Sequence, residues 1–233
     1  MIMNYLFGNM YNPNRYFSGN MLEIAKAIQE DDADKITELS KGVDLNQKGE
    51  KDMTLMWFSI VDPKHPHLKS LSTLVKLGVD PDMQLTPDGS LLDFALSGPA
   101  DMKYLKALLD GGLDVNQVYS DDDTLLIRAA GAVGSTEAVK LLVERGAKLD
   151  EVNSVGNTAF HESLYSFDAE IGLYLLDKGA KWDTHTGNGV STAWSVYNRI
   201  NRQDPGPSRT GFEKLRDAMI KKGVKFPPES PQE

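Results

Sequence analysis

Hydrophobic and polar positions recur along this chain in a unit of about 34 residues. One marker is a leucine-rich stretch that ends at a Gly, followed by an apolar residue and then Asp or Lys. A second marker is a Thr or Ser that precedes another short apolar stretch. The glycines of the first marker are Gly42, Gly78, Gly112, Gly146, Gly179 and Gly223. The hydroxyl residues of the second are Thr54, Ser90, Thr124, Thr158 and Thr192. Because the two markers keep one register, they predict an array of structural repeats.

Each unit predicts two short helices and a polar turn. The hydroxyl residue is expected to cap the first helix, and the Gly to end the second in a left-handed conformation. The side chain two positions after each cap is expected in the core, namely Met56, Leu92, Leu126, Phe160 and Trp194. Small residues five positions after the cap, Ala95, Ala129 and Ser163, indicate close approach of neighbouring helices. The second helix is clearest at 135–145, and polar fingers are predicted at 46–52, 81–89, 116–123 and 150–157.

The first twenty residues lack a basic segment, and the apolar cluster Tyr5–Phe7 is too short for a secretory signal. The chain is therefore either cytoplasmic or the mature form of an exported protein whose signal was replaced by a start Met. Asn20 is expected to cap a helix over 21–29.

Composition narrows the functional classes. The 233 residues are 40% hydrophobic and 25% charged, with a net charge of −9 and no Cys. This excludes disulfides, thiolate metal sites and a cysteine nucleophile, and no apolar run is long enough for a transmembrane helix. Residues 1–183 carry a net charge of −12 and residues 184–233 carry +3. An acidic surface disfavours nucleic acid as the main ligand and suits a basic partner.

The repeated units resemble ankyrin repeats over about residues 20–226, most closely at 124–150 and 158–183. The signature Pro after the capping residue is missing, the signature His remains only as His161, and about ten residues are inserted at 199–211. The resemblance implies an all-α solenoid of helix-turn-helix units with projecting β-hairpin-like finger loops. We expect an N-terminal extension at 1–19, about six repeats with degenerate caps at 20–226, and a tail at 227–233.

Residues with catalytic or metal-binding potential have simpler structural interpretations. The resemblance gives His161 a structural role between adjacent fingers, and its neighbours on a helix point away from it. His65 and His67 flank a turn proline without a third ligand nearby. The acidic run Asp121–Asp123 lacks the spacing of a calcium loop, and Gly187–Gly189 follows no predicted strand. We therefore expect no catalytic residue, no metal and no cofactor.

The resemblance also implies where a partner protein binds, since ankyrin repeats use variable finger residues and the exposed end of the first helix. The finger positions are Lys51, Met53, Pro87, Gly89, Asp121, Asp123, Val155 and Asn157. The helix-end positions are Asp62, Tyr165 and Ser166. Arg128 and Glu162 replace a customary aliphatic residue, either as partner contacts or as tolerated edge substitutions. Together these residues are expected to line one concave surface.

Two functions agree with such a surface. The degenerate array resembles bacterial ankyrin proteins encoded beside secreted toxins, including lipase or phospholipase effectors of type VI secretion. This implies a non-catalytic immunity protein, or antitoxin, that is monomeric when unbound and docks its concave face on a cognate toxin. The alternative is a generic scaffold or a secreted effector that binds host proteins. A third class, a hydrolase within the insertion at 199–211, has no recognisable catalytic constellation. The basic residues Arg199, Arg202 and Arg209 could contact phosphate or an acidic partner, but a solvated loop beside a C-terminal cap explains them without either.

Overall fold

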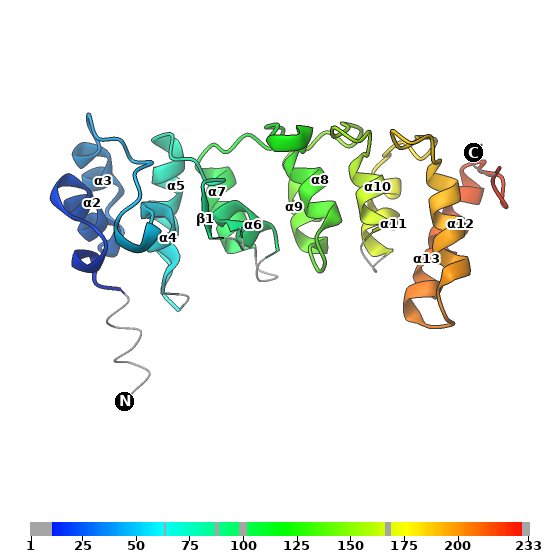
Figure 1. Cartoon of the computed structure of the whole chain (residues 1–233), viewed down its shortest axis with the longest axis horizontal. Helices are drawn as coiled ribbons and strands as arrows, with labels where there is room; N and C mark the ends of the chain where they lie inside the picture. The colour runs from blue at the N-terminus through cyan, green and yellow to red at the C-terminus, as the bar shows by residue number, and fades with distance from the viewer. Residues whose placement is uncertain (1–10, 63, 87–88, 98–101, 166–168, 230–233) are drawn as a thin grey trace. The chain divides into compact units, whose positions relative to one another are not determined.

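The computed structural model describes residues 11–62, 64–86, 89–97, 102–165 and 169–229. The chain divides into two compact units, Met1–Asp114 (unit 1) and Val115–Glu233 (unit 2). Figure 1 labels the helices of both. The predicted Tyr5–Phe7 cluster, Pro87 and Ser166 lie outside the described residues. The predicted all-α repeat of paired helices with projecting fingers is confirmed.

The described residues of unit 1 form three helix pairs and the turns between them. The helices of the pairs are α2 (Gly19–Gln29) with α3 (Ala33–Leu39), α4 (Leu55–Ile60) with α5 (Leu68–Lys76), and α6 (Leu91–Leu96) with α7 (Lys103–Asp110). Short 3-10 helices η1 (Pro13–Arg15) and η2 (Glu50–Asp52) precede α2 and α4. The finger before α6 is a hairpin of antiparallel strands β1 (Gln84–Thr86) and β2 (Gly89–Ser90).

Where the structure describes unit 2, three further helix pairs repeat the arrangement. The helices are α8 (Leu125–Gly131) with α9 (Thr136–Glu144), α10 (Ala159–Ser163) with α11 (Glu170–Asp177), and α12 (Thr192–Arg202) with α13 (Pro207–Lys221). The 3-10 helix η3 (Ser120–Asp122) forms the finger before α8. Single β-bridges, Val118 with Thr124 and His185 with Ser191, close the fingers before α8 and α12.

The predicted helix caps are confirmed in four repeats. The side-chain oxygens of Thr54, Ser90, Thr124 and Thr158 each accept a hydrogen bond from the backbone N–H three residues later. The fifth prediction is wrong, because Ser191 caps α12 instead. Thr192 is buried, and its hydroxyl lies 3.1 Å from the Thr184 carbonyl oxygen, to which it donates.

The predicted cap of the first described α-helix, α2, is also wrong. The N-cap of α2 is Ser18 and not Asn20, which lies inside the helix. Every predicted C-terminal glycine has a positive φ, as a left-handed helix end requires: Gly42, Gly78, Gly112, Gly146, Gly179 and Gly223.

Four of the five predicted core positions are buried, namely Met56, Leu92, Leu126 and Phe160. The small residues Ala95, Ala129 and Ser163 are buried as well. The prediction for Trp194 is wrong, because its side chain is only partly buried and lines a surface pocket. The physical reason is a difference in helix length. Helix α10, the first helix of the preceding repeat, has only 5 residues and covers little of the 11-residue α12.

Side-chain oxygens connect successive fingers within each unit. In unit 1 the Asn46 Oδ1 accepts the backbone N–H of Asp80 at 2.9 Å. In unit 2 the Asn116 Oδ1 accepts from Lys148 N–H, and the Asp150 Oδ1 from Lys181 N–H, both at 2.8 Å. These bonds fix the spacing of neighbouring fingers by satisfying backbone groups outside the helices.

The finger tips of unit 2 are also joined through their backbones. Ser154 N–H donates to the Asp121 carbonyl at 2.8 Å, and Gly187 N–H donates to the Val155 carbonyl at 2.9 Å. The second contact needs glycine on both sides. A Cβ on Gly187 would lie 2.6 Å from the Val155 oxygen, and one on Gly156 would lie 2.7 Å from the Gly187 nitrogen.

The insertion at 199–211 lengthens helices and is not the solvated loop expected from the sequence. It contributes the last turn of α12 and the first turns of the 15-residue α13, so that only 203–206 connect them. Pro207 at the start of α13 has the fixed φ that suits a helix beginning. Figure 1 shows α12 and α13 extending beyond the ends of α10 and α11.

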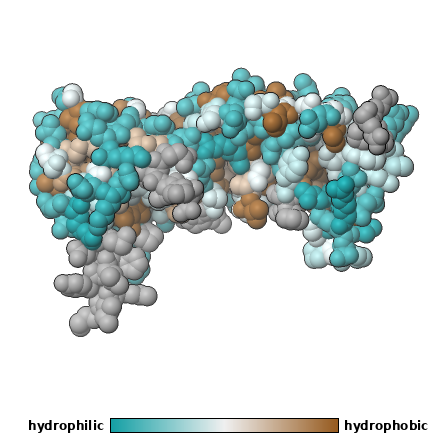
Figure 2. Space-filling model, viewed as in Figure 1, coloured by the Kyte–Doolittle hydropathy of each residue, from teal (hydrophilic) through white to brown (hydrophobic). Residues whose placement is uncertain are grey.

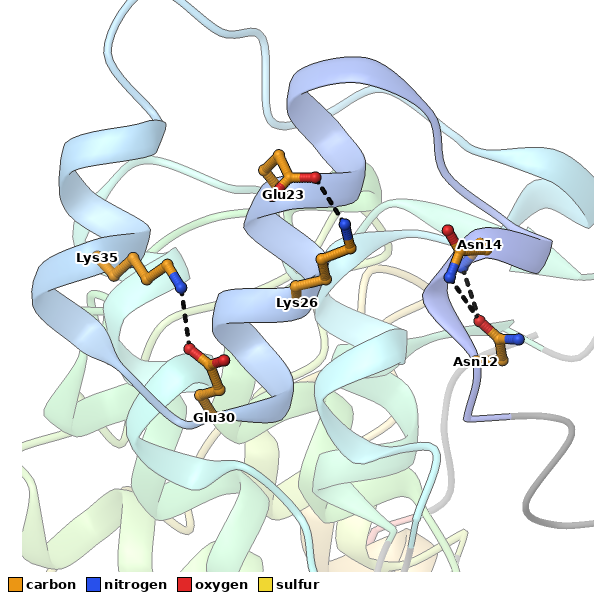
Figure 3. A network of polar contacts seen from close by, with 6 residues as sticks. All are labelled: Asn12, Asn14, Glu23, Lys26, Glu30 and Lys35. Carbon is orange, nitrogen blue, oxygen red and sulfur yellow. Dashed lines mark hydrogen bonds and ion pairs between the residues drawn. The ribbon is translucent and has the colours of Figure 1, made fainter.

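Exposed polar contacts cover the first helix pair. Lys26 pairs with Glu23 at 2.7 Å, and Lys35 pairs with Glu30 at 3.0 Å (Figure 3). The hydrogen bond and charge of Glu30 raise the pKa of Lys35. Such exposed pairs stabilise a protein little.

The face of the molecule drawn in Figure 2 is mainly hydrophilic, with hydrophobic residues in small separate groups.

The tip contact predicts a specific cost for Gly156→Ala. Strain at φ +77° together with the collision against Gly187 should lower the free energy of unfolding by about 3 kcal/mol, measured by urea denaturation. Gly134→Ala is the matched control, because its φ is +78° and a Cβ there meets nothing within 4 Å. It should cost only about 1 kcal/mol. Equal losses in the two variants would contradict the tip contact.

Candidate partner-binding site

The predicted finger residues of unit 1 lie at the ends of their turns. Lys51 is exposed, with a left-handed φ of 59°, and Met53 is half-buried, with its carbonyl accepting Gly49 N–H at 2.8 Å. Gly89 begins strand β2 with φ 122°. The hairpin and the 3-10 helix therefore hold these residues in defined backbone conformations.

Asp62 lies in the turn after α4. Its carboxylate accepts Lys64 N–H at 3.0 Å and contacts His65 Nδ1 at 3.2 Å. Partial burial opposes ionisation, but the hydrogen bonds from Lys64 and His65 outweigh it and lower the pKa of Asp62. His67 instead stacks on Tyr11, with ring centroids 5.4 Å apart, and burial lowers its pKa. Within the described ranges, no group of three or more His, Asp or Glu side chains is placed to hold a metal ion.

In unit 2, three of the predicted residues are exposed. Asp121 lies at the tip of η3 with φ 61°, and Val155 is 59% exposed on the next finger. Tyr165 is 60% exposed just after the end of α10. The tip hydrogen bonds described above hold the backbones of Asp121 and Val155, so these side chains project from a fixed frame.

A polar network connects the remaining predicted residues of these fingers. Asn153 Nδ2 donates to Asp123 Oδ1 at 3.1 Å and to Glu162 Oε1 at 3.4 Å. Asn157 Nδ2 donates to the same Glu162 oxygen at 2.8 Å. Asn157 is only 6% exposed, so it differs from the other predicted finger residues. Its side chain is enclosed and orients Glu162.

Arg128 also has an internal contact. Its guanidinium lies 5.2 Å from the centroid of the Tyr119 ring, in a cation–π arrangement. Arg128 and Glu162 are both partly exposed and both held by neighbouring residues. A substitution at either position therefore has a structural component as well as any effect on binding.

His161 connects two repeats, as its predicted structural role requires. Its Nδ1 accepts Thr158 N–H at 3.4 Å, and its Nε2 lies 2.9 Å from the Thr192 hydroxyl in the next repeat. The side chain is 2% exposed. Burial lowers its pKa to about 4, against an opposing hydrogen bond with Thr184 and a reinforcing charge effect of His185.

Sequence reasoning missed a pocket of about 450 Å³ in unit 2. One wall is the end of α10, with Leu164 and Tyr165, and the other is a face of α12 that includes Trp194, Arg199 and Arg202. Burial lowers the pKa of Arg199, and Tyr165 opposes this effect. The sequence signal for this pocket was the spacing of Trp194, Asn198 and Arg202 by four residues, which places side chains on one face of a helix. That signal could be used only if the helix was known to continue to Arg202.

Comparison with known proteins identifies the repeat. Residues 92–186 match the family model of ankyrin repeats in three copies. No curated protein matches the chain. Among solved structures, an ankyrin repeat domain from Acinetobacter baumannii is 21% identical, with a TM-score of 0.57, over 87% of this chain and 98% of that one. The ankyrin repeat domain of Bcl-3 is 20% identical, with a TM-score of 0.62, over 87% and 86%.

A third similar structure is a complex of a predatory endopeptidase from Bdellovibrio bacteriovorus with an immunity protein. It is 19% identical, with a TM-score of 0.51, over 82% of this chain and 97% of that one. At these identities the likeness shows the fold. Residues 92–186 are therefore similar to ankyrin repeats, a class of protein-interaction scaffold that generally lacks catalytic activity, and the solved structures show the same fold over most of the chain. Where the structure describes the chain, none of its helices meets the length and apolarity needed to cross a membrane.

The buried His161 predicts a dependence of stability on pH. In the unfolded chain its imidazole binds a proton below about pH 6.5, whereas in the folded protein it does so only near pH 4. The unfolded state binds more protons between these values, so stability falls as the pH decreases from 6.5 to 4. The loss from this group should reach about 3 kcal/mol, measured by urea denaturation at each pH.

Comparison of a His161→Gln variant with the unsubstituted protein isolates this contribution. All other acidic and basic groups are present in both proteins, so their effects on stability cancel in the difference. The variant should be less stable at pH 7, where it loses the contacts to Thr158 and Thr192, and should lose less stability on acidification. Identical pH profiles for the two proteins would contradict a neutral, buried His161.

Proposed function

We propose that the protein is a non-catalytic bacterial immunity protein that binds and neutralises a cognate secreted toxin, such as a lipase or phospholipase effector. The observation that carries this proposal is a set of partner-accessible side chains held on a hydrogen-bonded frame in unit 2. We call this set the finger surface, and it comprises Asp121, Asp123, Arg128, Val155, Glu162 and Tyr165.

The finger surface has the properties of a preorganised binding site. Its finger tips are connected by backbone hydrogen bonds, and Glu162 and Asp123 are oriented through Asn153. Ordering such residues before association reduces the entropy that binding costs. Tyr165 supplies an exposed aromatic side chain of the kind that often dominates interface energies. In unit 1 we also assign Lys51, Met53, Asp62 and Gly89 to the partner interface. From the sequence pattern we add Pro87 in unit 1 and Ser166 in unit 2.

A resemblance of the sequence and one similar structure support an immunity role over a generic scaffold. The sequence resembles ankyrin proteins encoded beside secreted toxins, and one similar structure is a complex that contains an immunity protein. The chain's net charge of −9 would accelerate its encounter with a basic surface of a toxin. Inhibition would follow from covering the catalytic mouth or a mobile lid of the toxin.

The test is co-expression of the protein with the products of the genes adjacent to its own. The proposal expects one neighbouring product to be toxic alone, harmless with this protein, and recovered with it as a stable complex at micromolar concentrations. If no neighbouring product binds and the protein captures host proteins instead, the effector alternative replaces the immunity role.

Substitutions in the finger surface should separate binding from folding. Tyr165→Ala and Asp121→Lys should each weaken binding to the partner about tenfold, measured by calorimetry, because they remove an aromatic contact and reverse a charge. Their melting temperatures should stay close to that of the unsubstituted protein. Lys51 has nearly the same φ as Asp121, so the backbone there accommodates Lys. Lys214→Ala on α13 is an exposed control. Lower melting temperatures with unchanged affinity would place the interface elsewhere.

A further inference from the structure

The pocket beside α12 has a chemical character unlike the rest of the chain. Arg199 and Arg202 contribute two guanidinium groups, and the described lining contains no carboxylate. Residues 1–183 carry a net charge of −12, whereas the C-terminal segment 184–233 carries +3. An anionic group is therefore attracted to this pocket although the protein as a whole is acidic.

The two arginines are arranged differently. Arg199 donates to the carbonyl of Leu164, and its guanidinium lies 5.6 Å from the centroid of the Phe212 ring. It is therefore a fixed positive charge inside the pocket wall. Arg202, one helical turn further along α12, is exposed. Its side chain can adjust to an anion that approaches the fixed charge.

The neighbouring Gln203 indicates what else a ligand must provide. Its amide Nε2 and Oε1 are both buried, and neither has a hydrogen-bond partner among the described residues. A buried amide without hydrogen bonds lowers the stability of the folded protein, and a ligand that hydrogen-bonds to it removes this cost. The pair offers a donor and an acceptor together, which matches the C=O and N–H of a peptide backbone. A phosphate ion presents mainly acceptor oxygens, so it matches this donor and acceptor pair less well than a peptide backbone does.

The other walls suit apolar side chains that flank an acidic residue. Leu164 and Val190 contribute aliphatic surface, and Trp194 and Tyr165 contribute aromatic rings. Trp194 is additionally fixed by Tyr197, with ring centroids 5.5 Å apart. The volume of about 450 Å³ is within the range of sites that enclose small ligands.

We propose that this pocket binds an acidic peptide segment of a partner protein. A Glu or Asp side chain lies between Arg199 and Arg202, apolar neighbours pack on Trp194, and the peptide backbone bonds to Gln203. This inference rests on the proposed protein-binding function and identifies the chemistry of one part of the interface.

The test uses two acetylated tripeptide amides, Leu-Glu-Leu and its uncharged isostere Leu-Gln-Leu. Binding is followed through the indole NMR signal of Trp194, assigned with a Trp194→Phe variant. The Glu peptide should saturate in the millimolar range and bind about fivefold more tightly than the Gln peptide, because only it carries the carboxylate.

Two substitutions assign this preference to the pocket. Arg202→Gln should remove the preference for the Glu peptide, whereas Lys214→Gln on α13 makes the same charge change outside the pocket and should retain it. Gln203→Leu should weaken both peptides without lowering the melting temperature, because it replaces a buried unpartnered amide by an apolar side chain. An amide with only a structural role would lower the melting temperature when replaced.

Each remaining outcome overturns the inference. These are the absence of a saturable shift up to about 10 mM peptide, equal affinity for the two peptides, and binding of inorganic phosphate more tightly than the Glu peptide. The proposed function fails separately. A neighbouring gene product that binds the Arg202→Gln and Gln203→Leu variants as well as the unsubstituted protein overturns only the pocket. Peptide binding without any toxin partner overturns only the immunity role.

Discussion

Within each unit, packing of one helix pair on the next is the interaction on which the structure depends. Helices such as α4 and α10, with 6 and 5 residues, are too short to be stable alone, and one pair cannot enclose its own apolar side chains. Stacking solves both problems, since residues such as Phe160 and Leu126 become buried between neighbours. The fingers then add hydrogen bonds, accepted by the side-chain oxygens of Asn116 and Asp150, that hold the pairs in register.

Local chemistry explains which parts of the fold could be predicted from sequence. Capping by Thr54 or Thr124 and chain reversal at Gly146 depend on residues a few positions apart, so the repeat was recognisable without a structure. The choice between Ser191 and Thr192 was not local. The Thr192 hydroxyl is hydrogen-bonded to Thr184 and to His161 of the preceding repeat, so it is not available to cap the helix. Ser191 caps α12 instead.

The candidate site was predictable to a similar extent. The positions of Asp121, Val155 and Tyr165 on exposed turns follow from the repeat, and their exposure agrees with it. The enclosure of Asn157 depends on its bond to Glu162, which the repeat pattern does not specify. The pocket depends on a difference in length between α10 and α12, because the uncovered face exists only where a long helix follows a short one.

The left-handed finger tips have an evolutionary consequence. Lys51 and Asp121 have φ values of 59° and 61°, and the residue that follows each is left-handed as well. The same backbone therefore carries a cation in one finger and an anion in another. Mutation at these sites can reverse a local charge without disturbing the stacked helices beneath. Variation of charge at the finger tips and inheritance of the stacked repeats can therefore proceed independently.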